Sequence, residues 1–154
     1  MKLLITPAQV AETAFRAPDF MTADAVPEAT ILAAQQKFIR PVLGGLYDRL
    51  CAGEYPELLS EYILPPLALY VKLLMLPSLS VQSGAAGVVE VNSKNLAKAS
   101  DTRLRYAVRR LRSDASALMD RAVQHIGTDP DAFPEYDARR NVRNRCSVDG
   151  QIVL

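Results

Sequence analysis

The sequence predicts a mostly α-helical fold: a bundle of about four helices, with a small glycine-containing β-like arm between the third and the last long helix. Apolar residues recur at steps of three and four along several stretches, which is typical of helices that bury one face. The 154 residues are 49% hydrophobic and 23% charged, a balance that excludes disordered and collagen-like chains. A chain of this length and composition can bury a core without metals or disulfides.

A short helix is expected near the N-terminus. Thr6 followed by Pro7 is an N-cap with proline at the first helical position, which predicts a helix over residues 7–15. The apolar run before Thr6 is shorter than the roughly 7–15 residues of a signal peptide, so we expect mature protein here. Residues 16–27 carry two prolines and small residues and predict a surface loop.

The second predicted helix begins at Glu28. Apolar residues then repeat with helical spacing from Ile31 to Leu50. Pro41 and the glycine pair at 44–45 interrupt the repeat, because proline cannot continue the hydrogen-bond ladder and glycine bends easily. We therefore expect either a kink near Arg40 or two helices that meet at an angle.

The third predicted helix, over residues 57–76, is apolar nearly all round. Such a helix belongs in the middle of a bundle or against another subunit. An overlapping stretch is long enough to span a membrane, but Lys72 and the prolines favour a buried helix. Pro65 and Pro66 should kink or restart this helix, and Pro77 should close it.

Residues 78–99 form the predicted arm. Alternating apolar residues around Gly84 and Gly87 indicate a loose β-hairpin or an extended segment. Small and β-branched residues that do not bury themselves against their own domain are suited to donating a strand to a neighbour. An ordinary surface hairpin is the alternative.

The last long helix is expected to begin after Ser100, its N-cap, and to stop at Gly127. Its apolar stripe runs from Leu104 to Ile126. The chain thus divides into a helical domain, residues 1–127, and an irregular C-terminal tail, residues 128–154, that we expect to be mobile or ordered by a partner.

Charge is segregated along the chain, although the formal net charge is only +1. Residues 1–93 hold six Lys/Arg and nine Asp/Glu, whereas residues 94–154 hold twelve and eight. The excess is mainly arginine, which suits bidentate contacts with carboxylate or phosphate. The alternative is a solvated helix face opposite the apolar stripe. Together with valines of the arm, these arginines make up the candidate partner interface: Val88, Val89, Val91, Arg103, Arg109, Arg110, Arg112, Arg139, Arg140, Arg143 and Arg145.

Few residues could carry catalysis. His125 is the sole imidazole and falls in the last turn of the last helix, where a histidine commonly meets the helix dipole. Cys51 and Cys146 lack metal-ligand spacing and are expected to be reduced thiols of a cytosolic protein. Glu57 and Glu61 lie one turn apart, but the Glu-x-x-His partner motif is missing. We expect a protein without enzymatic activity, catalytic residues, metal or cofactor, unless a pocket converges on His125 or a cysteine.

The run from Ile31 to Leu50 resembles a helix of the head–tail connector, or neck adaptor, proteins, which are small structural proteins of tailed phages and prophages. The order of elements is also similar, with an apolar helix containing Leu67 and Tyr70 and a glycine-rich arm. The resemblance covers roughly residues 3–126, and the tail departs from the family from Phe133 onward. The residues that carry it are of a packing type: Ile31, Ala34, Gln35, Ile39, Pro41, Leu43, Gly44, Leu46, Tyr47 and Leu50.

The resemblance implies a non-enzymatic subunit that assembles into a ring between portal and tail, with the arm and the last helix contacting neighbours. Its implied partners are copies of itself, the portal and tail-completion proteins, and DNA in the ring lumen, with no membrane. Its implied location is the virion, and the bacterial cytoplasm during assembly. The alternative is a helical nucleic-acid-binding protein that uses the arginine-rich last helix and tail.

Overall fold

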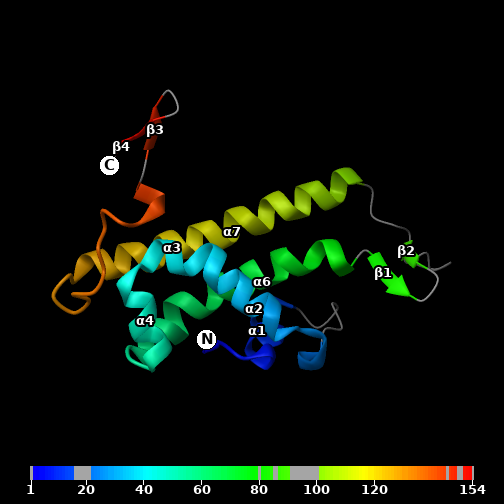
Figure 1. Ribbon diagram of the computed structural model, residues 1–154, viewed down its shortest axis with the longest axis horizontal. Coiled ribbons are helices and arrows are strands. Elements are labelled where there is room, and N and C mark those ends of the chain that lie inside the picture. The colour runs from blue at the N-terminus through cyan, green and yellow to red at the C-terminus, as the bar shows by residue number, and fades with distance from the viewer. Residues whose placement is uncertain are drawn as a thin grey trace.

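The computed structural model describes residues 2–15, 22–79, 81–84, 87–90, 101–144, 146–148 and 151–153. Within these residues the fold is mostly α-helical, as the sequence predicts (Figure 1). Turns η2 and η5 are 3-10 helical, and η3 and η4 are π-helical. The elements follow in this order: α1 (Pro7–Ala14), η2 (Ala23–Ala25), α2 (Glu28–Ala34), η3 (Gln35–Ile39), α3 (Arg40–Leu43), α4 (Gly45–Ala52), α5 (Pro56–Leu58), η4 (Leu59–Ile63), α6 (Leu64–Leu79), β1 (Val81–Gly84), β2 (Gly87–Glu90), α7 (Asp101–Thr128), η5 (Val142–Asn144), β3 (Cys146–Val148) and β4 (Gln151–Val153).

Helix α6 lies at the centre of the fold. It packs against α7 on one side and against α1 and α2 on the other, so that all four helices share one core (Figure 1). Among the described residues, one helical stretch, Pro56–Pro77, has the length and composition of a membrane span, and 50% of its most apolar window is buried inside the fold. Half of this apolar window is therefore used in packing within the fold.

Lys72 is the basic residue of that stretch. Its Nζ donates a hydrogen bond of 2.8 Å to the carbonyl oxygen of Ala14, at the end of α1. The same ammonium lies 4.7 Å from the centre of the Phe15 ring. A cation at a helix C-terminus interacts favourably with the helix dipole, and a cation over an aromatic face is attracted to it. Lys72 therefore joins α6 to α1.

Both π-helical turns precede prolines within continuous helices. Proline lacks a backbone donor, and its ring crowds the carbonyl four residues earlier. For Pro41 that carbonyl lies inside η3, and for Pro65 and Pro66 both carbonyls lie inside η4. The wider π turn accommodates the missing donor and the crowded carbonyl, and the helix continues as α3 or α6. The helical path is unbroken from Pro56 to Leu79, so in place of the kink or restart expected at Pro65 and Pro66 the structure has a π turn.

The chain changes direction at Gly44 rather than at Pro41. Gly44 has φ +57° and ψ −124°, a conformation that residues with a Cβ atom avoid, and it separates α3 from α4. Of the two alternatives expected for this region, the structure has two helices that meet at an angle, at residue 44. The apolar repeat from Ile31 to Leu50 is therefore divided between a first helix, formed by α2, η3 and α3, and a second helix, α4.

Gln35 is a fully buried polar side chain, with 0% exposure. Its Oε1 accepts a hydrogen bond of 2.9 Å from the backbone nitrogen of Leu4. Its Nε2 donates to the hydroxyl oxygen of Tyr47 at 3.0 Å and to the carbonyl of Lys2 at 3.3 Å. Burial raises the pKa of Tyr47 above its usual value. One amide therefore ties the N-terminal segment, η3 and α4 together.

Several expected boundaries are confirmed or corrected. Helix α1 has the expected Thr6 cap, completed by Gln9 as a capping box. Pro77 does not close α6, which continues to Leu79, because a proline in the last turn removes a hydrogen bond without ending the helical path. Helix α7 ends at Thr128, where the hydroxyl donates to the carbonyl of Gln124 at 2.9 Å.

The arm contains the expected hairpin. Strands β1 and β2 pair antiparallel, from Val81 opposite Glu90 to Gly84 opposite Gly87. The hairpin follows the end of α6 and lies beyond the helices (Figure 1). A second antiparallel pair, β3 with β4, was not predicted, because three-residue strands leave too little alternation to read.

Gly44→Ala should lower the free energy of unfolding by about 1–3 kcal/mol, because a Cβ atom is strained at this positive φ. Gly127→Ala is the matched control: both positions have open space around a new Cβ atom, but residue 127 lies in α7 without a positive φ. It should leave stability unchanged or raise it by up to about 1 kcal/mol. Urea unfolding monitored by circular dichroism measures the free energy of unfolding of both variants. Equal stability of the two variants would contradict the requirement for glycine at residue 44.

Gln35→Leu should lower the free energy of unfolding by about 2–4 kcal/mol, because it leaves the buried Leu4 nitrogen and its neighbours without partners. Tyr47→Phe removes only the hydroxyl that accepts from Gln35 and Gln36 and should cost less, about 1–2 kcal/mol. Denaturant titration of the two variants compares these losses. A Gln35→Leu chain as stable as the wild type would show that the amide is dispensable.

Candidate partner interface

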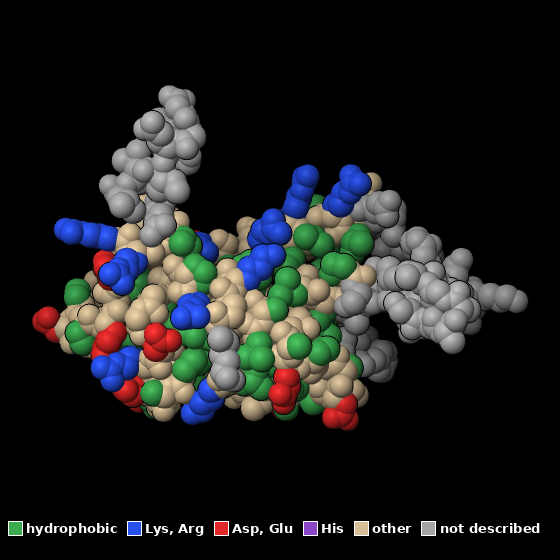
Figure 2. Space-filling view, in the orientation of Figure 1, with side chains coloured by type: hydrophobic (Ala, Val, Ile, Leu, Met, Phe, Trp, Pro, Cys, Tyr) green, Lys and Arg blue, Asp and Glu red, His purple; other side chains and the backbone are tan. Residues whose placement is uncertain are grey.

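Three arginines share one side of α7: Arg105, Arg109 and Arg112, which we call the basic face. Their spacing of four and three residues places them along one helix face. All three side chains are exposed, and none forms an ion pair with a described residue. In the space-filling view, Lys and Arg side chains follow the upper edge formed by α7, whereas basic and acidic side chains are mixed at the left end of the molecule (Figure 2). The basic excess of the sequence is therefore gathered in space mainly along α7.

Tyr106 stands beside the basic face and was missed by sequence reasoning. Its side chain is 67% exposed, which is unusual for a large aromatic residue. It lies on the side of α7 away from the apolar stripe, so the apolar periodicity did not mark it. Tyrosine and arginine are the residue types that dominate binding at protein interfaces.

A shallow hollow of about 430 Å³ continues the basic face toward the C-terminal half of α7, between Arg109 and Asp120. At its far end Arg143, from η5, is bound internally. The Arg143 guanidinium donates to Asp120 at 2.9 Å and to the Ser116 hydroxyl at 2.6 Å. Arg143 therefore holds the C-terminal segment on α7, and its charge is already compensated.

The other predicted interface residues are dispersed. Arg110 lies on another side of α7, 3.9 Å from Asp114. Arg139 and Arg140 are exposed in a turn, and Arg140 lies 3.5 Å from Asp137. Val88 and Val89 belong to β2, and Arg103 belongs to α7. Val91 and Arg145 lie outside the described residues.

The segment 129–144 is irregular, as expected, but it is packed on the helices rather than loose. Phe133 and Asn141 are buried. The carbonyl oxygen of Glu135 would lie 3.0 Å from a Cβ atom at Gly45, so the segment approaches α4 as closely as a glycine permits. These contacts do not fit the mobility expected for residues 129–144. The turn-rich sequence gave no sign that Phe133 and Asn141 would be buried and would anchor the segment.

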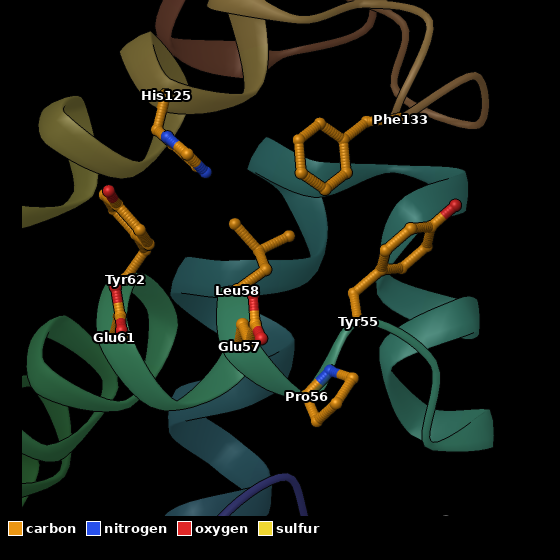
Figure 3. A pocket seen from close by; sticks show the side chains of 8 residues that line it. All are labelled: Tyr55, Pro56, Glu57, Leu58, Glu61, Tyr62, His125 and Phe133. Carbon is orange, nitrogen blue, oxygen red and sulfur yellow. The ribbon is translucent and has the colours of Figure 1, made fainter.

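An open cleft of about 330 Å³ lies between the α4–α5 turn, η4 and the end of α7 (Figure 3). The rings of Tyr62 and His125 stack at 4.0 Å, with Leu58 beside them and Tyr55 and Phe133 on the other side. We call this the aromatic cleft. Glu57 and Glu61 also line it, and both are exposed.

Tyr55 holds one wall of the aromatic cleft in a strained backbone conformation, with φ +56°. Its ring packs against Phe133 at 5.3 Å, and its hydroxyl donates to Glu135 at 3.1 Å. Burial, together with this hydrogen bond, raises the pKa of Tyr55. Glu135 also pairs with Arg49 at 3.1 Å, so these contacts compensate the strain.

The aromatic cleft includes His125, but its described lining lacks the usual partners of a catalytic imidazole. Neither a serine nor a cysteine lines it, and His125 makes ring contacts rather than a hydrogen bond to a lining carboxylate. Cys51 is a free thiol elsewhere, on α4. No group of three potential metal ligands occurs among the described residues.

A protein-family model matches residues 22–146, which is most of the chain. The chain belongs to the DUF6712 family. The description of DUF6712 is a family of unknown function. No curated protein and no solved structure matches the chain. The DUF6712 match begins before α2 and ends in β3, so it includes α7, the aromatic cleft and the packed segment 129–144.

Arg143→Ala should release this packed segment of the DUF6712 chain. Because hydrogen bonds to charged groups contribute about 1.5–3 kcal/mol, less where water screens them, we expect a loss of about 1–2 kcal/mol. Amide hydrogen exchange in residues 129–144 should speed up accordingly. Arg140→Ala, the control, removes an exposed pair and should leave exchange unchanged. Equal exchange rates in both variants contradict the anchoring role of Arg143.

Proposed function

We propose that this DUF6712 protein is a non-enzymatic structural subunit of a phage or prophage neck. It assembles with copies of itself into a ring between portal and tail, as a head–tail connector or adaptor. The observation that carries the proposal is the basic face of α7 with Tyr106 beside it: a rigid, exposed surface rich in the residue types that bind proteins. It lies on the helix whose other side packs on α6.

The resemblance of the Ile31–Leu50 run to connector proteins supports the same proposal through the fold. The hydrophobic residues that carry this resemblance are largely buried, together with Gln35. These residues therefore stabilise the fold of the subunit, whereas the exposed surface of α7 is the proposed contact with neighbours. The portal and tail-completion proteins are the proposed neighbours, in the virion and in the host cytoplasm during assembly.

The β1–β2 hairpin supports an assembling subunit for a separate reason. Within the described residues each strand pairs only with the other, and the hairpin contacts the body through α6. Such strands have a free edge on which a neighbouring chain can add a strand. A ring subunit gains from an arm of this kind because it reaches past its own body.

A helical nucleic-acid-binding protein is the second candidate. The three arginines of the basic face, which pair with no described residue, favour it, because their charges suit phosphate oxygens, and DNA in the ring lumen would use the same side chains. An exposed aromatic residue beside them also suits stacking on unpaired bases. The two candidates differ in how they respond to salt and to loss of the arm.

Light scattering after size exclusion, over a concentration series, tests the proposal on the full chain and on a chain lacking residues 80–92. We expect large, concentration-dependent species from the full chain and their loss without the arm. A strictly monomeric full chain at every concentration contradicts the ring subunit. Retention on DNA that weakens steeply with salt and disappears in Arg105→Glu/Arg109→Glu would then favour the second candidate.

A further inference from the structure

The aromatic cleft has the features of a docking site for a cationic side chain. Tyr55 and Phe133 form one wall, and the stacked Tyr62 and His125 form the other (Figure 3). Aromatic rings attract guanidinium groups, and one example lies beside the cleft, outside its lining: the guanidinium carbon of Arg121 lies 4.9 Å from the centre of the Tyr62 ring. The ring of Phe133 lies 6.0 Å from that of His125, so a guest side chain would contact the rings at the open mouth of the cleft.

Two carboxylates give the aromatic cleft its charge. Glu57 and Glu61 are exposed and form no ion pair with any described residue. They lie four positions apart on one helical stretch, a spacing of about 6 Å between their Cβ atoms. A cation at the mouth of the cleft therefore meets two carboxylates that pair with no described residue, whereas a phosphate group would be repelled.

We infer that the aromatic cleft of one subunit receives Arg105 and Arg109, on the basic face of α7, from a second copy of the chain. This rests on the proposed function, because it names the surfaces through which the subunits of a ring would contact one another. Arg105 and Arg109 are also four positions apart on a helix, so their spacing matches that of Glu57 and Glu61. Both sets of side chains are exposed and without ion-pair partners among the described residues.

Charge complementarity and position favour a second copy as the occupant. Arg109 and His125 are 16 residues apart on the continuous helix α7, which is about 24 Å at 1.5 Å per residue. The helix holds the two surfaces apart, so one molecule cannot bring its own arginines into its own cleft. Two different surfaces that bind each other between copies give a head-to-tail contact, which closes into a ring or extends into a filament.

Charge-reversal variants of the full chain test this pairing by light scattering. Glu57→Lys/Glu61→Lys blocks the cleft, and Arg105→Glu/Arg109→Glu blocks the basic face. Each should weaken self-association by about tenfold or more at low salt. Glu12→Lys/Asp24→Lys and Lys2→Glu/Lys37→Glu are controls with the same changes in charge at exposed positions outside every proposed interface, and both should assemble like the wild type.

Mixing the two blocked variants gives a sharper readout. One keeps an intact basic face and the other an intact cleft, so the mixture should form a 1:1 complex and nothing larger. A chain carrying all four reversals should assemble again, because the charges are exchanged rather than removed. Circular dichroism and thermal unfolding of each variant establish that a loss of assembly is not a loss of fold.

The outcomes separate this inference from the proposed function. If the wild type assembles and both blocked variants assemble equally well, the pairing is overturned and the ring subunit stands on other surfaces. If both blocked variants are monomeric but their mixture forms no complex, the pairing is overturned as well. A wild-type chain that never associates overturns both the pairing and the ring.

Discussion

The amide of Gln35 is the contact on which the rest of the fold depends. It is buried in the core, and its hydrogen bonds reach the N-terminal segment and α4 as well as its own helical stretch. A buried amide has few alternative partners, so these segments are held in one arrangement. The position of α4 in turn fixes the α4–α5 turn and the ring of Tyr55. A polar contact inside the core thus determines the shape of a cleft at the surface.

Much of the fold could be predicted because local signals and packing agree. Thr6 and Pro7 mark the start of α1, the periodicity after Glu28 marks the next helices, and the glycines at 84 and 87 mark the hairpin. The prolines were the difficult part. A proline in sequence indicates a break, but the π turns before Pro41 and Pro65 absorb the conflict and keep the helix continuous. That adjustment depends on the surrounding packing, which a sequence window does not contain.

The sequence locates the basic segments of the candidate interface but not the arrangement of their side chains. An arginine count identifies basic segments, whereas it does not say which charges are already paired. Arg143 is bound by Asp120 and Ser116, although it looks in sequence like its neighbours in the tail. The aromatic cleft could not be predicted, because Tyr62, His125 and Phe133 come from three segments that only the folded chain brings together. Tyr106 could be recognised only from its exposure.

Because Phe133 packs against Tyr55, the aromatic cleft can form only after the helical core. Synthesis proceeds from the N-terminus, so the central helices can begin to associate before residue 133 leaves the ribosome. The aromatic cleft gains its second wall only when the segment after α7 folds back over Gly45 and Glu135 reaches Tyr55. A nascent or shortened chain therefore lacks one wall of the aromatic cleft even when its core has formed. Under the proposed pairing, only a chain extended past Glu135 could receive the arginines of a neighbour.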